Sequence, residues 1–302
     1  MKKFAIAAVA AAAMSVGVAH AYTAGTFSNG FVVPNVIHNG VTNTTTVGVV
    51  NQTGSDVNVF WTFFGQDSQH ITDGCFKMTD KDYEPFVWSE RAGGNTAGVR
   101  GYLVFTVGAT TSGAGATAAS SCTTAASNAA VGKIAGHAFQ VVTASSDVAY
   151  TPVIDGPLFI RPNDDLTTLG ADSLLAVKGA AQTTGSPAIV APAVADANFS
   201  MRYYLEGGAK TNIVVWSTGS QKGSHTVNIF DDKQNRKSVN FDLAHTELDW
   251  FDPAPIVGRP ASYVDGFIEW NANAVMTGSV FTYSVIDAPA FGAIQTVLGF
   301  HR

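Results

Sequence analysis

Short runs of apolar residues, each closed by a turn signal, recur along the chain. In His225–Phe230 the letters HTVNIF place Val227 and Ile229 on one face, and Val57–Phe64 (VNVFWTFF) begins with the same alternation before it becomes continuously apolar. Alternation with a period of two predicts β-strands. Polar, Gly- and Pro-containing clusters separate the runs at Gln52–Asp56, Arg91–Asn95, Ser217–Ser224, Asp231–Asn235 and Asp252–Pro255. We therefore expect an all-β protein built as a β-sandwich.

The strand pattern occurs twice. Five segments of the first half are Thr46–Asn51, Asp56–Phe64, Tyr83–Trp88, Arg100–Phe105 and Ala135–Val142. Five segments of the second half resemble them in the same order: Asn212–Ser217, His225–Asp231, Thr246–Phe251, Asp265–Trp270 and Thr277–Val285. The first four pairs keep offsets between 162 and 170 residues, which aligns VNVF at Val57 with VNIF at Val227. This order predicts two tandem, duplicated units.

The fifth pair has a shorter offset, because aligning Phe139 with Phe281 gives 142 residues. The first unit therefore carries extra residues before its last strands. The stretch 108–130 consists of Ala, Thr, Ser and Gly, with one Asn and Cys122, and holds no charge. Such a composition predicts a flexible surface insertion.

After residues 1–21, the expected organisation has three parts. A first sandwich covers 22–155, a linker covers 156–197, and a second sandwich covers 198–302. Within the linker, Ala171–Ala181 has a cap residue, an apolar run and a closing Gly179, which predict a short helix. The architecture resembles immunoglobulin-like and fibronectin-like modules, whose common fold implies no common function.

Residues 1–21 read as a secretory signal peptide. Lys2 and Lys3 precede an uncharged Ala- and Val-rich stretch, and Ala19–Ala21 (AHA) has the small-x-small pattern of a cleavage site. The expected protein is thus bacterial and exported, to the cell surface, the extracellular medium or the periplasm. No other stretch is long and apolar enough to be a transmembrane helix.

Composition narrows the class of partner. Removing Lys2 and Lys3 takes the formal charge from -6 to -8, and the basic residues do not form a stripe. A nucleic-acid partner is therefore not expected. The two cysteines, Cys75 and Cys122, are expected to pair as a disulfide, because oxidation is the usual fate of a cysteine pair in an exported protein.

Two acidic runs are candidate calcium sites. Asp80, Asp82 and Glu84 stand at alternate positions, and Asp231, Asp232 and Asn235 follow the second VN(V/I)F motif. Calcium prefers oxygen ligands of this kind, but neither run has the closing glutamate of an EF-hand, and solvated turns explain both. No other cofactor is expected.

One strand is a candidate contact surface. Trp61 stands among Phe60, Phe63 and Phe64, and so much aromatic surface on a single strand could form an exposed interface. The five tryptophans, Trp61, Trp88, Trp216, Trp250 and Trp270, are otherwise expected in the cores.

Catalytic motifs are missing from the sequence: there is no G-x-S-x-G, no H-E-x-x-H and no phosphate-binding glycine loop. The leading expectation is a non-enzymatic structural, adhesion or assembly protein that binds itself or an envelope component. A carbohydrate- or calcium-binding module is the first alternative. A hydrolase with two carboxylates, which would need a defined separation in a cleft, is the second.

Overall fold

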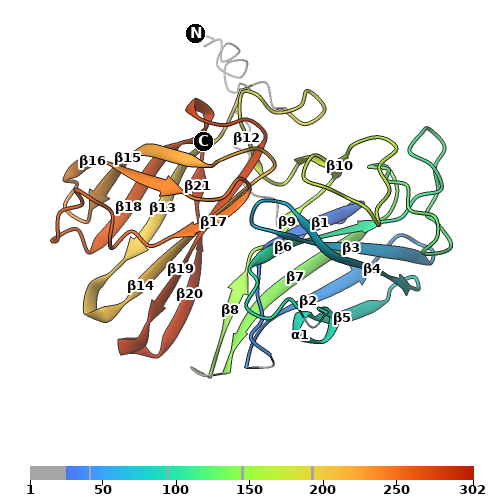
Figure 1. Ribbon diagram of the computed structural model, residues 1–302, viewed down its shortest axis with the longest axis horizontal. Coiled ribbons are helices and arrows are strands. Elements are labelled where there is room, and N and C mark those ends of the chain that lie inside the picture. Colours follow the sequence, from blue (N-terminus) through green and yellow to red (C-terminus); the bar gives the residue numbers. More distant parts are fainter. Residues whose placement is uncertain (1–24, 41, 94, 144–145, 192–193) are drawn as a thin grey trace, which may run out of the picture.

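A computed structural model describes residues 25–40, 42–93, 95–143, 146–191 and 194–302. The expected signal peptide, 1–21, lies outside these ranges. Almost all regular structure is β-strand (Figure 1). Within the described ranges, no helix has the length and apolar character needed to cross a membrane.

The first half of the protein comprises β1 to β9. Its strands are β1 (Gly30–Val36), β2 (Asn43–Asn51), β3 (Val57–Gly65), β4 (His70–Met78), β5 (Tyr83–Val87), β6 (Gly101–Val107), β7 (Ile134–Val142), β8 (Asp147–Thr151) and β9 (Ile154–Asp155), with one helical turn, α1 (Trp88–Arg91). They form two antiparallel sheets, ordered β4-β3-β6-β1-β9 and β5-β2-β7-β8. We call these sheet B and sheet A.

The second half comprises β13 to β21. Its strands are β13 (Asn198–Tyr204), β14 (Lys210–Ser217), β15 (Gly223–Asp231), β16 (Arg236–Leu243), β17 (Leu248–Phe251), β18 (Asp265–Asn271), β19 (Ser279–Ala288), β20 (Ala293–Leu298) and β21 (Phe300–His301). Short 3-10 turns occur at Glu206–Gly208, Ala272–Ala274 and Pro289–Phe291. One sheet, sheet G, has the order β16-β15-β18-β13-β21, and the other, sheet F, contains β17-β14-β19-β20.

The two halves have the same strand order. Replacing β1–β9 by β13–β21 one for one converts sheet B into sheet G and sheet A into sheet F. The order of the strands therefore repeats, as the sequence pattern indicated. Descent from a duplicated ancestor and membership of the immunoglobulin-like type remain predictions.

Hydrogen bonds and ring pairs define which positions are equivalent. Phe31 stacks on its pairing partner Phe105, as Phe199 stacks on Trp270. Counting along the same strands, Leu103 matches Ile268. Since Phe63 pairs with Leu103 and Ile229 pairs with Ile268, Phe63 is equivalent to Ile229.

This equivalence corrects the predicted alignment. Val57 and Val227 do lie on corresponding strands, but Val227 matches Trp61, four positions further along. Gln52 N–H donates to Lys133 O as Thr218 N–H donates to Ser279 O, so Lys133 is equivalent to Ser279. Six residues further along, Phe139 is therefore equivalent to Val285, and not to Phe281. Both errors are shifts by four residues. An even shift keeps every side chain on its face, so alternation alone cannot detect it.

Each half has a core between its two sheets. In the first half the members include Phe31, Trp61, Phe63, Phe86 and Trp88. In the second half they include Phe199, Tyr203, Ile229, Phe241 and Trp270. Residues from both sheets meet in each cluster, which gives each half a sandwich-like build.

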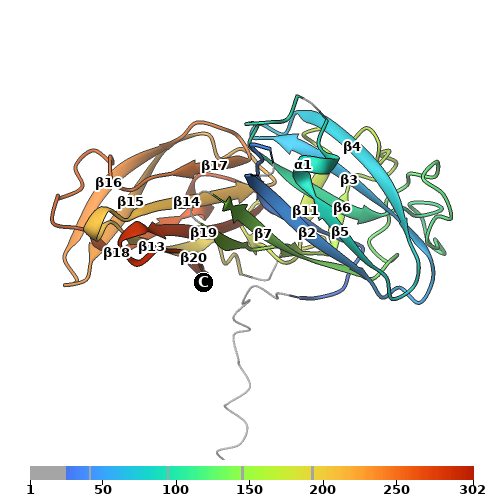
Figure 2. The same cartoon turned by 90° about the horizontal axis from the view of Figure 1, so that it is seen from below.

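A third core joins the halves. It contains Phe64 and Tyr102 from the outward face of sheet B, and Trp216 and Phe281 from the outward face of sheet F. Residues from the connecting segment, 156–197, complete it: Leu158, Ile160, Leu166, Leu169, Leu174, Val177 and Ala180. The two halves therefore lie side by side (Figure 2), and a continuous apolar layer lies between them.

The predicted helix at Ala171–Ala181 is wrong. Leu174–Val177 is strand β11, which pairs with β10 (Leu158–Ile160), and Ala181–Gln182 is β12, which pairs with β19. A helix of this length is marginal in isolation, whereas strand pairing buries Leu174 and Val177 in the third core. Tertiary packing therefore decided the conformation.

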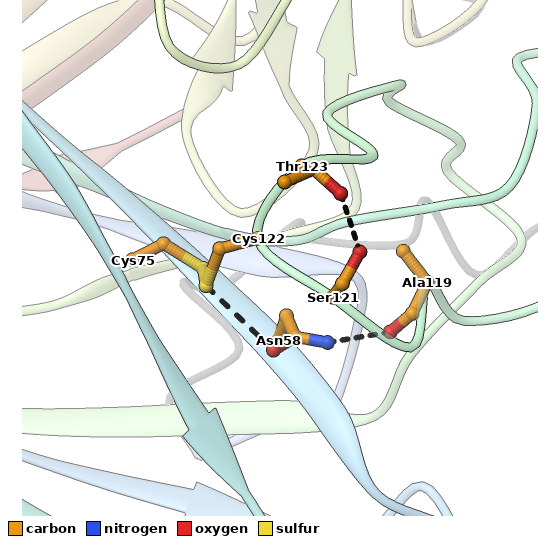
Figure 3. The surroundings of a disulfide bond; sticks show 6 residues. All are labelled: Asn58, Cys75, Ala119, Ser121, Cys122 and Thr123. Carbon is orange, nitrogen blue, oxygen red and sulfur yellow. Dashed lines mark hydrogen bonds between the residues drawn. A yellow bond between two sulfur atoms is a disulfide. The ribbon is translucent and has the colours of Figure 1, made fainter.

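The predicted disulfide is present. Cys75 on β4 and Cys122 are bonded, with their Cα atoms 5.9 Å apart (Figure 3). Beside them, Asn58 Nδ2 donates to Ala119 O at 2.7 Å, and Asn58 Oδ1 lies 3.7 Å from Cys122 Sγ. The insertion 108–130 is thus tied to sheet B at two neighbouring points.

Candidate functional site

The predicted contact surface is wrong, because Phe60, Trp61, Phe63 and Phe64 are all buried. Trp61 and Phe63 point into the core of the first half, whereas Phe60 and Phe64 point into the core between the halves. Strand β3 is covered on both faces. A continuously apolar run, unlike the alternating HTVNIF, is typical of such a strand, and this signal was available in the sequence.

Polar groups border the core between the halves. The turn from β3 to β4 meets the turn before β17: Gln66 O accepts from the backbone N–H groups of Glu247 and Leu248, at 3.2 and 3.0 Å. Asp67 Oδ2 lies 2.9 Å from His245 Nδ1, and its Oδ1 accepts from Thr246 N–H at 2.9 Å. These bonds fix the turn of one half against the turn of the other.

A buried chain of hydroxyl and carboxyl groups lies behind this contact. Ser68 Oγ is hydrogen-bonded to Tyr102 OH, and Tyr102 OH donates to Glu247 Oε2 at 3.4 Å. Burial raises the pKa of Glu247 to about 7. The Tyr102 hydrogen bond opposes this rise, while Asp172 and Asp67 add to it. Near neutral pH, this carboxyl group therefore exchanges a proton while it is enclosed by protein.

Arg100 of the first half contacts Trp250 of the second half. Its guanidinium carbon lies 3.5 Å from the centre of the Trp250 ring, and its Nη1 donates to Asn35 Oδ1 at 2.6 Å. Trp250 is 41% exposed, in contrast to the four buried tryptophans. The expectation of core positions holds for Trp61, Trp88, Trp216 and Trp270, and it is wrong for Trp250.

The acidic run at Asp231 forms a closed turn. Asp231 Oδ1 accepts from the N–H groups of Lys233 and Asn235, and Oδ2 accepts from Asn235 Nδ2 at 2.8 Å. Burial would raise the pKa of Asp231, but the hydrogen bonds from Asn235 and Lys233 outweigh it and lower the pKa. Asp232 is exposed on the same turn. The Asp231 carboxylate thus stabilises the turn by accepting its N–H groups.

The run at Asp80 behaves similarly. Asp80 Oδ1 accepts from Gly54 N–H at 2.8 Å, and Asp82 Oδ1 accepts from Tyr83 N–H at 2.9 Å. Glu84 instead forms an ion pair with Arg91. Across the described residues, no group of three or more His, Cys, Asp or Glu side chains is placed to hold a metal ion.

Sheet A has an open aromatic face. Its outward side chains include Tyr83, His137, Phe139, Val148 and Tyr150. Tyr83 stacks on His137, and Phe139 meets Tyr150 edge to face. Tyr83 is 53% and Val148 51% exposed. A contiguous apolar face of this kind on a solvent-exposed sheet is typical of a contact surface.

Sheet G has a second open face. Phe230 and Phe267 stack on it, with ring centroids 4.7 Å apart and planes 8° from parallel. Phe267 and Phe300, which is 75% exposed, line a hollow of about 540 Å³ on this face. Arg202, Asp232 and Asp265 also line this hollow. Sequence reasoning missed both faces, because each gathers residues from separate strands.

Comparisons with protein-family models, with curated proteins and with solved structures found no match to this chain.

Proposed function

We propose that this chain is an exported, non-enzymatic protein that acts in structure, adhesion or assembly at the cell surface or outside the cell. It does so by associating with copies of itself or with an envelope component. The observation that carries the proposal is the pair of open aromatic faces, on sheet A and on sheet G. Both lie on regular sheets, which present side chains with little further loss of entropy.

The experiment is size-exclusion chromatography with light scattering on residues 22–302, over a range of protein concentrations. Self-assembly predicts a mass that rises with concentration. A parallel pull-down with isolated envelope material examines the second kind of partner. A chain that stays monomeric and binds no envelope fraction contradicts the proposal.

The carbohydrate-binding alternative is less well supported. It required exposed tryptophan beside an acidic loop, and Trp250, which is partly exposed, has Arg100 stacked on its ring. The calcium alternative is weakened because the carboxylates of Asp80, Asp82 and Asp231 already accept backbone N–H groups. A thermal shift with calcium that chelator reverses would favour it again.

A further inference from the structure

The halves of this protein contact each other through unlike faces. The first half uses the outward face of sheet B, and the second half uses the outward face of sheet F. The edge strands β8 and β20 also meet, where Thr296 Oγ1 donates to Tyr150 O. Sheet B corresponds to sheet G, and sheet F corresponds to sheet A. One copy therefore leaves two faces open: sheet G, which is equivalent to sheet B, and sheet A, which is equivalent to sheet F. Two different faces that could pair between copies are the property of a heterologous interface.

The ring pair at the centre of the internal contact has an exposed counterpart. Phe64 stacks on Tyr102 with centroids 5.1 Å apart, and both rings are buried between the halves. The equivalent positions in the second half are Phe230 and Phe267, which also pair and stack. Similarly, Ile154, which pairs with Val32 in the internal contact, matches the exposed Phe300.

Sheet G keeps apolar side chains at only some of the positions that are buried on the outward face of sheet B. At the other end of sheet B, Asn29 exchanges hydrogen bonds with Leu158 of the connecting segment. Among the residues that the structure describes, no such segment covers sheet G. There the positions equivalent to Val32, Phe60 and Val104 are Ser200, Thr226 and Glu269. On the outward face of sheet G, Phe230 and Phe267 are flanked in register by Arg236 and Arg202, and the next row is polar apart from Phe300.

The charges at the turns are also matched. Gly65 N–H donates to Gln69 O as Asp231 N–H donates to Asn235 O, so the turns are alike in length and Asp67 matches Lys233. Since Asn51 N–H donates to Asp82 O as Ser217 N–H donates to Glu247 O, His245 matches Asp80. The internal pair of Asp67 with His245 becomes Lys233 with Asp80, so the carboxylate and its basic partner change places.

The outward face of sheet A can be compared in the same way with its equivalent, the outward face of sheet F. Leu248, whose N–H bonds to Gln66 O in the internal contact, matches Tyr83 on sheet A. Trp216, which meets Tyr102, matches Val50. The exposed side chain of Tyr83 and the half-buried side chain of Val50 would face the phenyl rings of sheet G.

We propose that copies of this chain associate head to tail, with the outward face of sheet G of one copy packed on the outward face of sheet A of the next. The contact repeats the packing of sheet B on sheet F, without the contact of β8 with β20 that already joins the halves within each copy, and it brings Lys233 of one copy to Asp80 of its neighbour. This inference rests on the proposed function and names its partner as a second copy. Because the two faces differ, association continues into linear assemblies.

The test blocks one face at a time in residues 22–302. Phe267→Asp disables sheet G, and Tyr83→Asp disables sheet A; Phe291→Ser, at an exposed phenylalanine in the Pro289–Phe291 turn, is the control. We expect each blocked variant to be monomeric, with association weakened roughly tenfold or more by the buried charge. The control should assemble like the wild type. A mixture of the two blocked variants should form a dimer and nothing larger, because one intact pair of faces remains.

Charge exchange supplies a second measurement. Lys233→Asp should weaken association roughly three- to tenfold by repulsion from Asp80, and Lys233→Asp combined with Asp80→Lys should restore it. Far-ultraviolet circular dichroism of each variant serves as the control for folding. If the wild type assembles but the mixture stays monomeric, or the blocked variants assemble normally, this interface is wrong and the proposed function stands. A wild type that is monomeric up to about 100 µM overturns the proposed interface. The proposed function would then depend on binding to an envelope component alone.

Discussion

Tyr102 and Trp216 meet edge to face across the boundary between the two halves, with their ring centroids 5.8 Å apart. Both side chains are buried there. The same layer includes residues of the connecting segment, so separating the halves would expose all three parts to water. The halves are therefore expected to unfold in one transition rather than as independent domains.

Trp216→Ala should lower the free energy of unfolding by about 3–5 kcal/mol, because a large buried ring leaves a cavity that the sheets cannot close. Trp250→Ala, at a partly exposed ring held by Arg100, should cost about 1 kcal/mol. Denaturant unfolding followed by fluorescence and circular dichroism measures both. Equal losses for the two variants would contradict the assignment of Trp216 to the centre of the contact.

Removing the disulfide should destabilise the protein by about 4 kcal/mol, since it closes a loop with a sequence separation of 47 residues. The double variant Cys75→Ala with Cys122→Ala should also expose the insertion 108–130 to protease. Limited proteolysis with mass spectrometry locates the cuts. Cleavage that begins elsewhere, with the insertion still protected, would show that Asn58 alone is enough to hold it.

Stability should rise as the pH falls from above 7 toward 4.5. The pKa of Glu247 is raised to about 7 in the folded protein, so in this window the folded state binds a proton that the unfolded chain does not. The contribution is at most about 3 kcal/mol. Glu247→Gln should remove this dependence and raise the melting temperature at pH 8. Melting curves of both proteins at pH 5 and pH 8 make the comparison, and identical pH profiles would contradict it.

Asn58→Ala should cost about 1–3 kcal/mol, because it leaves the carbonyl of Ala119 buried without its donor. The equivalent position in the second half is Ser224, which is exposed and has no insertion beside it. Ser224→Ala should therefore change stability by less than about 0.5 kcal/mol. Thermal unfolding of the two variants, together with hydrogen exchange at Ala119, measures the difference.

The sequence was sufficient for the strands, the repeated order and the disulfide. Each depends on local chemistry: the alternation around Val227 and Ile229, the turn residues between strands, and a lone cysteine pair. The alignment of Val57 with Val227 failed by four residues, since hydrogen-bond register depends on partners that are distant in sequence.

The packing between the halves could not be predicted from the local pattern of apolar and polar residues. Whether Phe64 faces water depends on the position of Trp216 and of the connecting segment, which alternation along β3 does not encode. For the same reason Leu174–Val177 became a strand despite its helix-like boundaries, and the open faces of sheets A and G were missed. Burial on a second face is a tertiary property, and only the continuous apolar run of β3 hinted at it.

The core between the halves also sets an order of events during biosynthesis. Phe64 and Tyr102 leave the ribosome or a translocation channel well before Phe281 and Tyr283, which belong to the same core. At ordinary rates of synthesis the delay is on the order of ten to thirty seconds. For that time the aromatic face of sheet B is an exposed, nascent surface, so a holdase chaperone that binds this chain should protect Phe64 and Tyr102 and release them when β19 arrives.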